Sequence, residues 1–201
     1  MIYYYPNRPF LIPPDSEMVQ QKSDDPNWDA EIKWGGDRLG LWKTKEQFPK
    51  QFSSFVFWNR QNEIFKKYEP SPELLDELNS LELPFETALD GELLHFKTRN
   101  YKHCIVFYDA YIVGDQRCVV ELRNRRDIMA SYFKARKFKL IHMAEQFQTD
   151  FKQHFDKVIV DDEKEGLVMK DKNGKIQWNT VKSPDVAWQL KIRKPEKNYK
   201  F

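Results

Sequence analysis

The fold of this chain is first indicated by one short segment, Glu31-Ile32-Lys33-Trp34-Gly35-Gly36-Asp37-Arg38. A lysine acts as a nucleophile only when neutral, and partial burial beside positive charges favours that form. The two glycines permit a tight turn that brings backbone close to a ligand. The arginine that follows is suited to sugar or phosphate oxygens. Taken alone, however, the segment fits a strand end followed by a turn better than a catalytic site.

Further charged segments follow it along the chain. They are Leu89-Asp90-Gly91-Glu92-Leu93, Val106-Phe107-Tyr108-Asp109, Glu165-Gly166-Leu167-Val168-Met169-Lys170 and Trp188-Gln189-Leu190-Lys191-Ile192-Arg193. Lys191 and Arg193 lie two residues apart, so in a strand they point to the same face. Glu165 is expected at the start of a strand that also carries Lys170. A cleft lined by carboxylates on one side and cations on the other suits a metal-bound triphosphate.

Length and charge indicate one globular domain. The chain has 201 residues, with 33 Lys and Arg against 31 Asp and Glu, for a net charge of +2. The overall charge therefore does not by itself mark a nucleic-acid-binding protein. Basic residues gather at 117–139 and 191–200. Local basic surface is what phosphate binding requires, although such runs are more often simply solvated faces.

Several classes of protein are disfavoured by what the sequence lacks. No stretch approaches the about 20 apolar residues of a membrane span, and the opening residues do not resemble a secretion signal. Cys104 and Cys118 form no metal-binding pattern, which disfavours structural zinc and favours a reducing compartment. We expect a protein of the cytoplasm, or of the host cell's cytoplasm if the chain is viral, with no membrane partner.

The periodicity of apolar residues predicts many strands and few helices. Ser71-Pro72-Glu73 opens a helix as cap, first helical position and first-turn acid, with Leu74, Leu75, Leu78 and Leu81 on its buried face. We expect an extended segment over 1–30, strands over 32–42, 53–65, 87–96, 103–113, 138–143, 166–170, 175–179 and 187–193, helices over 124–133 and 144–158, and a hairpin turn at 172–175. This order predicts an α+β protein with mainly antiparallel sheets.

Together, the five charged segments resemble the motifs of the adenylation domain of ATP-dependent polynucleotide ligases, a branch of the covalent nucleotidyltransferase superfamily. Lys33, Gly36 and Arg38 match the family pattern of lysine, a variable residue, an acid, glycine, a variable residue and arginine. The resemblance covers nearly the whole chain. It implies one nucleotidyltransferase domain over 1–201, without a C-terminal oligonucleotide-binding domain, in an ATP-grasp-like fold of mainly antiparallel sheets flanked by helices.

The resemblance also implies a role for each site residue. By this likeness Lys33 carries AMP, Glu31 reads the adenine amino group, Tyr108 stacks on adenine and Glu92 holds the ribose hydroxyls. The implied catalytic residues are Lys33, Lys191 and Glu165; the nucleotide-binding residues are Glu31, Ile32, Arg38, Glu92, Tyr108, Val168, Lys170 and Arg193; the metal-binding residues are Glu165 and Glu92; and the nucleic-acid-binding residues are Arg38 and Arg60. The implied cofactors are ATP and Mg²⁺ or Mn²⁺. The implied partner is nicked duplex DNA, with or without RNA in its strands, and we expect a monomer.

Departures from the family pattern leave alternatives open. Gly35 stands where an acid or amide is usual, and Arg193 stands where a second lysine is common. A catalytically impaired nucleic-acid-binding relative would fit the first departure. An RNA ligase shares the same motifs, although the opening Tyr4-Tyr5-Pro6-Asn7-Arg8-Pro9 favours DNA. A messenger-RNA guanylyltransferase fits less well, because it also needs a C-terminal domain.

The sequence leaves one arginine cluster unassigned. Arg123, Arg125 and Arg126 fall in the predicted helix 124–133 or just before it. They would either hold a backbone phosphate or solvate the helix, and the sequence favours neither.

Overall fold

The glycine pair after Lys33 divides the chain between two β-sheets. The computed structural model describes residues 2–134 and 137–195. The single strand predicted over 32–42 is instead two strands, β2 (Trp28–Trp34) and β3 (Asp37–Lys43), in different sheets. A β carbon at Gly36 would lie 2.6 Å from the carbonyl oxygen of Leu93. Only glycine therefore lets the connecting turn pass this close to the neighbouring strand.

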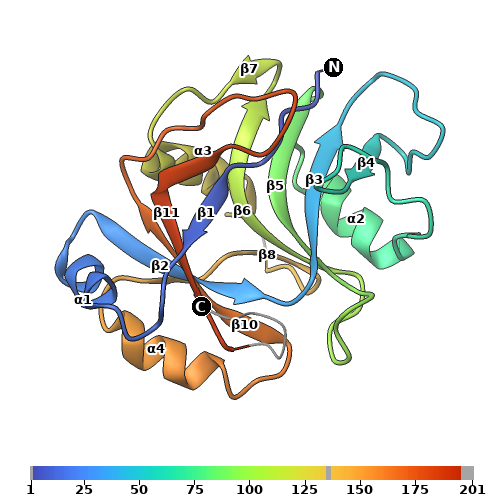
Figure 1. Cartoon of the computed structure of the whole chain (residues 1–201). Helices are drawn as coiled ribbons and strands as arrows, with labels where there is room; N and C mark the ends of the chain where they lie inside the picture. Colours follow the sequence, from blue (N-terminus) through green and yellow to red (C-terminus); the bar gives the residue numbers. More distant parts are fainter. Residues whose placement is uncertain (1, 135–136, 196–201) are drawn as a thin grey trace.

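Sheet A holds β2 and four other strands in the order β1-β11-β10-β2-β9 among the described residues. Their bounds are Arg8–Leu11 for β1, Gln146–Phe147 for β9, Lys164–Asp171 for β10 and Asp185–Arg193 for β11. The pairs are antiparallel except β1 with β11. Helices α1 (Glu17–Asp24) and α4 (Phe151–Val158) cover one face, where Ala30, Leu167, Met169, Phe151 and Phe155 form a core (Figure 1). The opposite face is left for polar side chains.

Sheet B has the order β4-β3-β5-β6-β7, with β8 pairing to β6. The bounds are Phe55–Trp58 for β4, Thr87–Leu94 for β5, Cys104–Val113 for β6, Gln116–Arg117 for β7 and Ile141–Met143 for β8. Helices α2 (Pro72–Ser80) and α3 (Leu122–Phe133) pack on it through Leu74, Leu78 and Met129. The predicted cap of α2 is confirmed, because the Ser71 hydroxyl accepts the Leu74 amide at 3.2 Å. The α+β class with mainly antiparallel sheets is confirmed as well.

Three further predicted elements are wrong in extent or type. Residues 1–30 are not extended throughout, since they contain β1 and α1, and only 55–58 of the predicted strand 53–65 belong to β4. The helix predicted over 144–158 begins only at Phe151, because Gln146 and Phe147 pair with Glu31 and Ala30 as the edge of sheet A. The amphipathic spacing of the phenylalanines holds for α4 but does not extend back through the edge strand.

The strand predicted over 175–179 is absent from the structure. Its backbone bonds instead to the N-terminal segment: the Gln177 amide donates to Asn7 Oδ1 at 2.9 Å, and the Tyr5 amide donates to the Asn179 carbonyl at 2.9 Å. The turn at 172–175 therefore leads into a long connection rather than a tight hairpin, and β11 starts only at Asp185. None of the helices formed by residues 2–134 and 137–195 is both long and apolar enough to cross a membrane.

Candidate functional site

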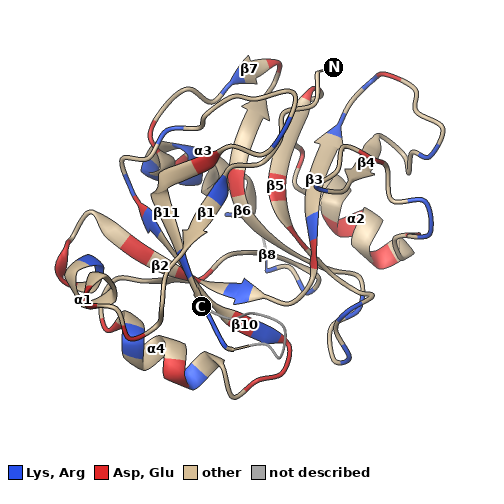
Figure 2. Ribbon diagram, viewed as in Figure 1, with Lys and Arg blue, Asp and Glu red and all other residues tan. Residues whose placement is uncertain are grey.

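The polar faces of the two sheets enclose a cleft of about 700 Å³. Every site residue expected from the sequence lines it: Glu31, Ile32, Lys33, Arg38, Arg60, Glu92, Tyr108, Glu165, Val168, Lys170, Lys191 and Arg193. These side chains come from strands of both sheets and, for Arg60, from the loop after β4. Two acids and then a lysine follow one another along β2, while β5 carries acids (Figure 2). Segments more than 150 residues apart in sequence thus meet in one place.

Strand alternation explains the polar wall of sheet A. Asp29, Glu31 and Lys33 are spaced by two along β2 and so share one face. The register brings Glu31 opposite Val168 of β10, and Val168 opposite Lys191 of β11. These three residues therefore form one row across the sheet. The core-facing positions between them are apolar, which is why the sheet buries one face and lines the cleft with the other.

A bulge in β10 lets Glu165 reach Lys33. The pairing of β10 with β2 shifts between Lys164 and Gly166. Gly166 has φ +149°, and a β carbon there would lie 2.1 Å from the carbonyl oxygen of Ile192, so only glycine is tolerated. The Lys33 Nζ donates to Glu165 Oε2, and the same oxygen lies 3.3 Å from the Arg193 guanidinium. The lysine and the carboxylate are each about a quarter exposed, at 24% and 26%.

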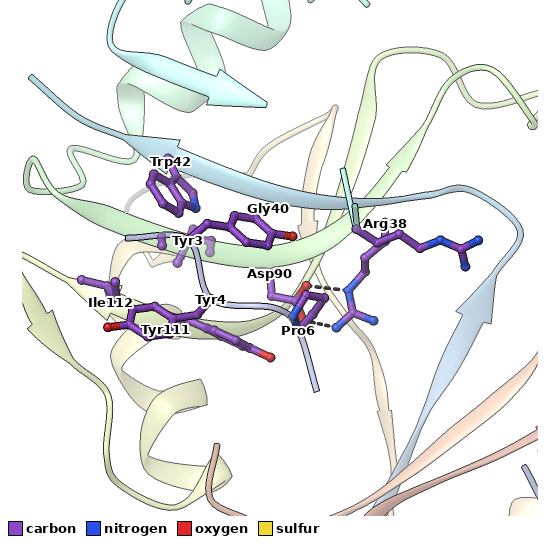
Figure 3. Close-up of a pocket in the computed structure, with 12 residues that line it drawn as sticks. Tyr3, Tyr4, Pro6, Arg38, Gly40, Trp42, Asp90, Tyr111 and Ile112 are labelled. Atoms are coloured by element: carbon purple, nitrogen blue, oxygen red, sulfur yellow. Dashed lines mark hydrogen bonds and ion pairs between the residues drawn. The ribbon is translucent and has the colours of Figure 1, made fainter. Parts of the chain in front are cut away.

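On sheet B, Arg38 is held by Asp90. The guanidinium makes a two-point contact with the carboxylate, with Nε 2.5 Å from Oδ1. Burial raises the pKa of Asp90, and Arg38 acts in the opposite direction. The contact defines a small cavity of about 30 Å³ behind the pair, walled by Tyr3 and Trp42, whose rings stack (Figure 3). This cavity has room for about two water molecules and none for a nucleotide.

Glu92 faces two cations and is nonetheless a weak acid. Burial raises its pKa to about 7, against the opposite effect of Lys33 and then of Arg38. Glu165 adds to the rise, so the two carboxylates are close enough to interact. Burial also lowers the pKa of Lys191, and the charge of Lys33 lowers it further.

Tyr108 presents its ring to the cleft. The side chain is 9% exposed, and burial raises its pKa well above the usual value, so the phenol stays neutral. The Lys170 Nζ lies 5.2 Å and the Arg38 guanidinium carbon 5.6 Å from the ring centroid. An aromatic face ringed by cations is a suitable platform for a flat, electron-rich group.

A buried ionic network that extends from α3 to the wall of the cleft was not anticipated. Arg126 of α3 donates to Asp29 Oδ2 at 2.7 Å and to Glu31 Oε1. The other Glu31 oxygen lies 2.5 Å from the Lys170 Nζ. Burial raises the pKa of Asp29, with Arg126 opposing it. The sequence signal was available in Trp28-Asp29-Ala30-Glu31-Ile32: two acids at alternate positions of an otherwise apolar strand need a buried cation.

The arginine cluster is neither a phosphate clamp nor a solvated face. Arg125 is fully buried and binds Asp109 through Nε at 2.7 Å and Nη2 at 2.8 Å. Arg126 is 6% exposed within the network above. Only Arg123 lies at the surface, where it donates to Asn173 at 2.6 Å. Both alternatives weighed from the sequence therefore fail for the two buried arginines, because the helix turns them toward acids on the sheets.

The carboxylates in the cleft determine how a metal ion could bind there. In the described ranges, no group of three or more His, Cys, Asp or Glu side chains is arranged to hold a metal ion on its own. Glu92 and Glu165 do supply two interacting carboxylates in the cleft. Mg²⁺ is usually bound by one or two carboxylates together with substrate phosphates and water. These two residues therefore fit a cation that arrives with a phosphorylated substrate.

Comparison with known proteins identifies the fold. Neither a family model nor a curated protein matches the sequence. Among solved structures, the chain is similar to a mycobacterial DNA ligase D complexed with ATP and MES, at TM-score 0.66 and 16% identity over 94% of this chain and 60% of that one. It is similar to a Lig E DNA ligase at TM-score 0.56 and 12% identity, over 93% and 69%. An archaeal ATP-dependent RNA ligase matches at TM-score 0.55 and 12% identity, over 94% and 48%.

These likenesses show a shared fold. The chain has a fold that also occurs in DNA and RNA ligases. It spans about 60% of the length of the mycobacterial ligase chain and about half of the archaeal one. The expected fold class and its likeness to the fold of ligases are thereby confirmed, while the roles of individual residues stay predictions.

Proposed function

We propose that this domain is the catalytic unit of an ATP-dependent polynucleotide ligase that seals nicks in duplex DNA through a lysyl-AMP intermediate on Lys33. One observation carries the proposal: the Lys33 amine lies in a cleft between two sheets, in contact with Glu165 and surrounded by Glu92, Lys191 and Arg193. The fold supports the proposal, because one structural neighbour, a mycobacterial DNA ligase D, was solved in complex with ATP.

The first step of the proposed reaction forms a phosphoramide bond. The neutral Lys33 amine attacks the α-phosphorus of ATP, the bond to the bridging oxygen of the β-phosphate breaks, and pyrophosphate leaves. The amine loses a proton during this step, and Glu165 is the carboxylate already in contact with it. Lys191 and Arg193 lie on the same strand face and would neutralise charge on the α-phosphate.

The remaining steps join the strands. The 5′-phosphate at a nick attacks the phosphorus of lysyl-AMP and frees Lys33, which yields a strand capped by AMP. The 3′-hydroxyl then attacks that 5′-phosphate and expels AMP, with loss of the hydroxyl proton. Arg38 and the exposed Arg60 line the cleft and would contact the nucleic-acid phosphates. To reach them, Arg38 would have to exchange part of its contact with Asp90.

The base and sugar would bind against sheet B and the floor of sheet A. Tyr108 would stack on adenine, with Ile32 and Val168 as apolar neighbours, and Glu92 would hold the ribose hydroxyls. Glu31 and Lys170 would meet the adenine edge. When bound, Mg²⁺ or Mn²⁺ would supply positive charge to the triphosphate, held on the protein side by Glu165 and Glu92.

A ligase acting on RNA is the second candidate, because the archaeal RNA ligase shares the fold at nearly the same TM-score as the Lig E DNA ligase. Sealing assays on nicked duplexes with DNA or RNA on either side of the nick would separate the two. An inactive relative is the third candidate, because Gly35 has no side chain at the position where the ligase pattern has an acidic residue. A β carbon there would lie 3.7 Å from Glu165 Cγ, so an acid at 35 would crowd a second carboxylate against the first.

The test is incubation with ATP labelled at the α-phosphate, with Mg²⁺, followed by denaturing electrophoresis. We expect a labelled protein band that is lost in Lys33→Ala and kept in Lys152→Ala, a control at an exposed lysine on α4. Label that persists in Lys33→Ala would show that another group is the nucleophile. A wild-type protein that takes no label, and whose intact mass shows no AMP already attached, would contradict the proposal.

A further inference from the structure

Helix α3 binds each of the two sheets through one of two adjacent arginines. Arg125 contacts Asp109 on β6 of sheet B, and Arg126 contacts Asp29 and Glu31 on β2 of sheet A. All five side chains are buried. Because consecutive helical residues point about 100° apart, a single turn of one helix can reach acids on both walls of the cleft. The two arginines are therefore matched in burial and partner type but differ in which wall they hold.

The contacts of Arg126 lead directly to the cleft. Arg126 binds Glu31 through Oε1, which leaves Oε2 on the other side of the carboxylate, 2.5 Å from the Lys170 Nζ. Glu31 and Lys170 both line the cleft, whereas Arg126 does not. The two acids and two cations balance in charge, so the network is neutral as a whole. Arg126 thus decides which carboxylate oxygen is presented beside the lysine, without itself touching the cleft.

An acceptor beside a donor is a pattern that distinguishes purines. Adenine presents an amino donor at N6 next to an acceptor at N1, whereas guanine presents an acceptor at O6 next to an N1–H donor. Glu31 Oε2 can accept from the adenine amino group while the Lys170 Nζ donates to N1. With guanine, the Glu31 carboxylate would face the O6 acceptor and the Lys170 ammonium would face the N1–H donor. Both contacts would be unmatched, and unmatched buried polar contacts are costly.

We propose that Arg126 is a positioning residue that sets the preference of the cleft for adenine over guanine nucleotides, by fixing the orientation of the Glu31 carboxylate beside Lys170. The inference rests on the proposed nucleotide site. Without the two contacts of Arg126, the carboxylates of Asp29 and Glu31 repel each other on one face of β2, and Lys170 still pairs with Glu31. The carboxylate is then free to turn, and the donor and acceptor lose their fixed order.

The experiment measures the dissociation constants of ATP and GTP by titration calorimetry and, in parallel, the rates of protein labelling by the two α-labelled nucleotides. Arg126→Lys keeps the charge but loses the fork that bridges two acids. We expect the ratio of GTP to ATP dissociation constants to fall at least about tenfold, with ATP weakened more than GTP. Arg125→Lys is the matched control. Its partner Asp109 also lines the cleft, but on sheet B, where the neighbouring Tyr108 would stack on either purine. This variant should therefore lower stability without changing the ratio.

A second variant protects the test against misfolding. Arg126→Lys combined with Asp29→Asn removes the acid that competes with Glu31 for the shorter side chain, so the new ammonium group and Lys170 hold Glu31 from opposite sides. The double variant should fold and restore much of the wild-type ratio. An unchanged ratio in Arg126→Lys, or equal losses in Arg125→Lys and Arg126→Lys, would overturn the inference. If the double variant folds but discriminates no better than Arg126→Lys, the inference is overturned as well.

The two proposals fail in different ways. Wild-type protein that binds ATP over GTP but takes no label would contradict the ligase proposal, and loss of that preference in Arg126→Lys would still support the role of Arg126. Wild-type protein that is labelled, with an unchanged ratio in the variant, would contradict only the role of Arg126. Wild-type protein that binds neither nucleotide would reject both.

Discussion

The charge of Glu92 depends on two opposing effects, burial and the nearby cations. It lies on β5 with Lys33 and Arg38 as cationic neighbours, and both favour its ionised form. Burial of the carboxyl group favours its neutral form and has a larger effect than the two cations, so the pKa of Glu92 rises from 4.5 to about 7. A carboxyl group that is half protonated near neutral pH is well suited to contact either a hydroxyl or a cation, depending on what enters the cleft.

The raised pKa predicts a pH-dependent cost to the fold. Between pH 4.5 and 7 the folded state holds the Glu92 proton more tightly than the unfolded state, so stability is lost as the pH rises through this window. Glu92→Gln removes that loss. In buffer free of divalent cations, we expect the variant to match wild type near pH 4.5 and to be more stable by about 1–2 kcal/mol at pH 8, a value reduced for partial exposure of the side chain.

Urea unfolding at several pH values measures this difference, and Glu73→Gln provides a control of opposite sign. The pKa of Glu73 is lowered by a backbone hydrogen bond at the start of α2 and by Ser71. Its ionised form therefore stabilises the fold above pH 4.5, so the glutamine variant should lose stability there. Parallel pH profiles for the two variants would contradict the account of Glu92.

At the scale of elements, the loop between β5 and β6 connects the two segments that carry Lys33 and Glu165, to which we propose a catalytic role. The Glu163 carboxylate, two residues before Glu165, accepts the backbone amides of Arg99 and Asn100, the latter at 2.7 Å. The Glu163 carbonyl accepts the Gly35 amide at 2.9 Å. In the same loop, Lys97 donates to the Gly36 carbonyl at 2.9 Å. The loop thereby links the turn after Lys33 to the start of β10.

This arrangement predicts that Glu163→Ala weakens both the fold and the site. Two backbone amides would lose their acceptor, which costs about 1–3 kcal/mol, and the contact between Lys33 and Glu165 would loosen. We expect lower stability together with slower labelling from ATP, while Glu163→Gln, which keeps one acceptor oxygen, should lose less of each. Asp162→Ala, at the exposed neighbouring residue, is the control. Full labelling rates in a destabilised Glu163→Ala protein would show that the loop does not position the site.

At the scale of the whole molecule, the cleft is bounded by two sheets that pack on separate cores. A ligand that contacts Lys33 and Lys191 on one sheet and Glu92 and Tyr108 on the other would hold the two together. In Lys33→Ala, which cannot be labelled at that residue, ATP at 100 times its dissociation constant should add about 2.7 kcal/mol of stability. We expect this as a rise of several degrees in Tm.

Differential scanning fluorimetry with increasing ATP measures that rise. GTP should give a smaller shift at equal concentration, and pyrophosphate a smaller one still, because neither meets both the base and the phosphate contacts. A Tm that does not change with ATP would show that the folded cleft has no affinity for the nucleotide, and would count against the function proposed for it.

Much of the candidate site followed from the sequence because its residues lie at regular strand positions. Alternation alone places Lys191 and Arg193 on one face, whereas the strand predicted over 32–42 left Asp29 and Glu31 out and so missed the face that they share with Lys33. Helix α2 was also locally encoded, by a serine cap and a proline in the first turn. Such features depend on neighbours only a few residues away, so composition and spacing are sufficient to predict them.

Tertiary structure decided the features that depend on distant partners. The division of residues 32–42 between two sheets depends on the close approach of Gly36 to β5, and the loss of a strand at 175–179 depends on bonds to Asn7, 170 residues away. The contact of Arg126 with Glu31 spans 95 residues. The sequence by itself determined which side chains each strand presents, because backbone periodicity is local. Only the folded chain decided which of them meet, because burial forces each charge to find its partner wherever the packing of two sheets and a helix brings one within reach.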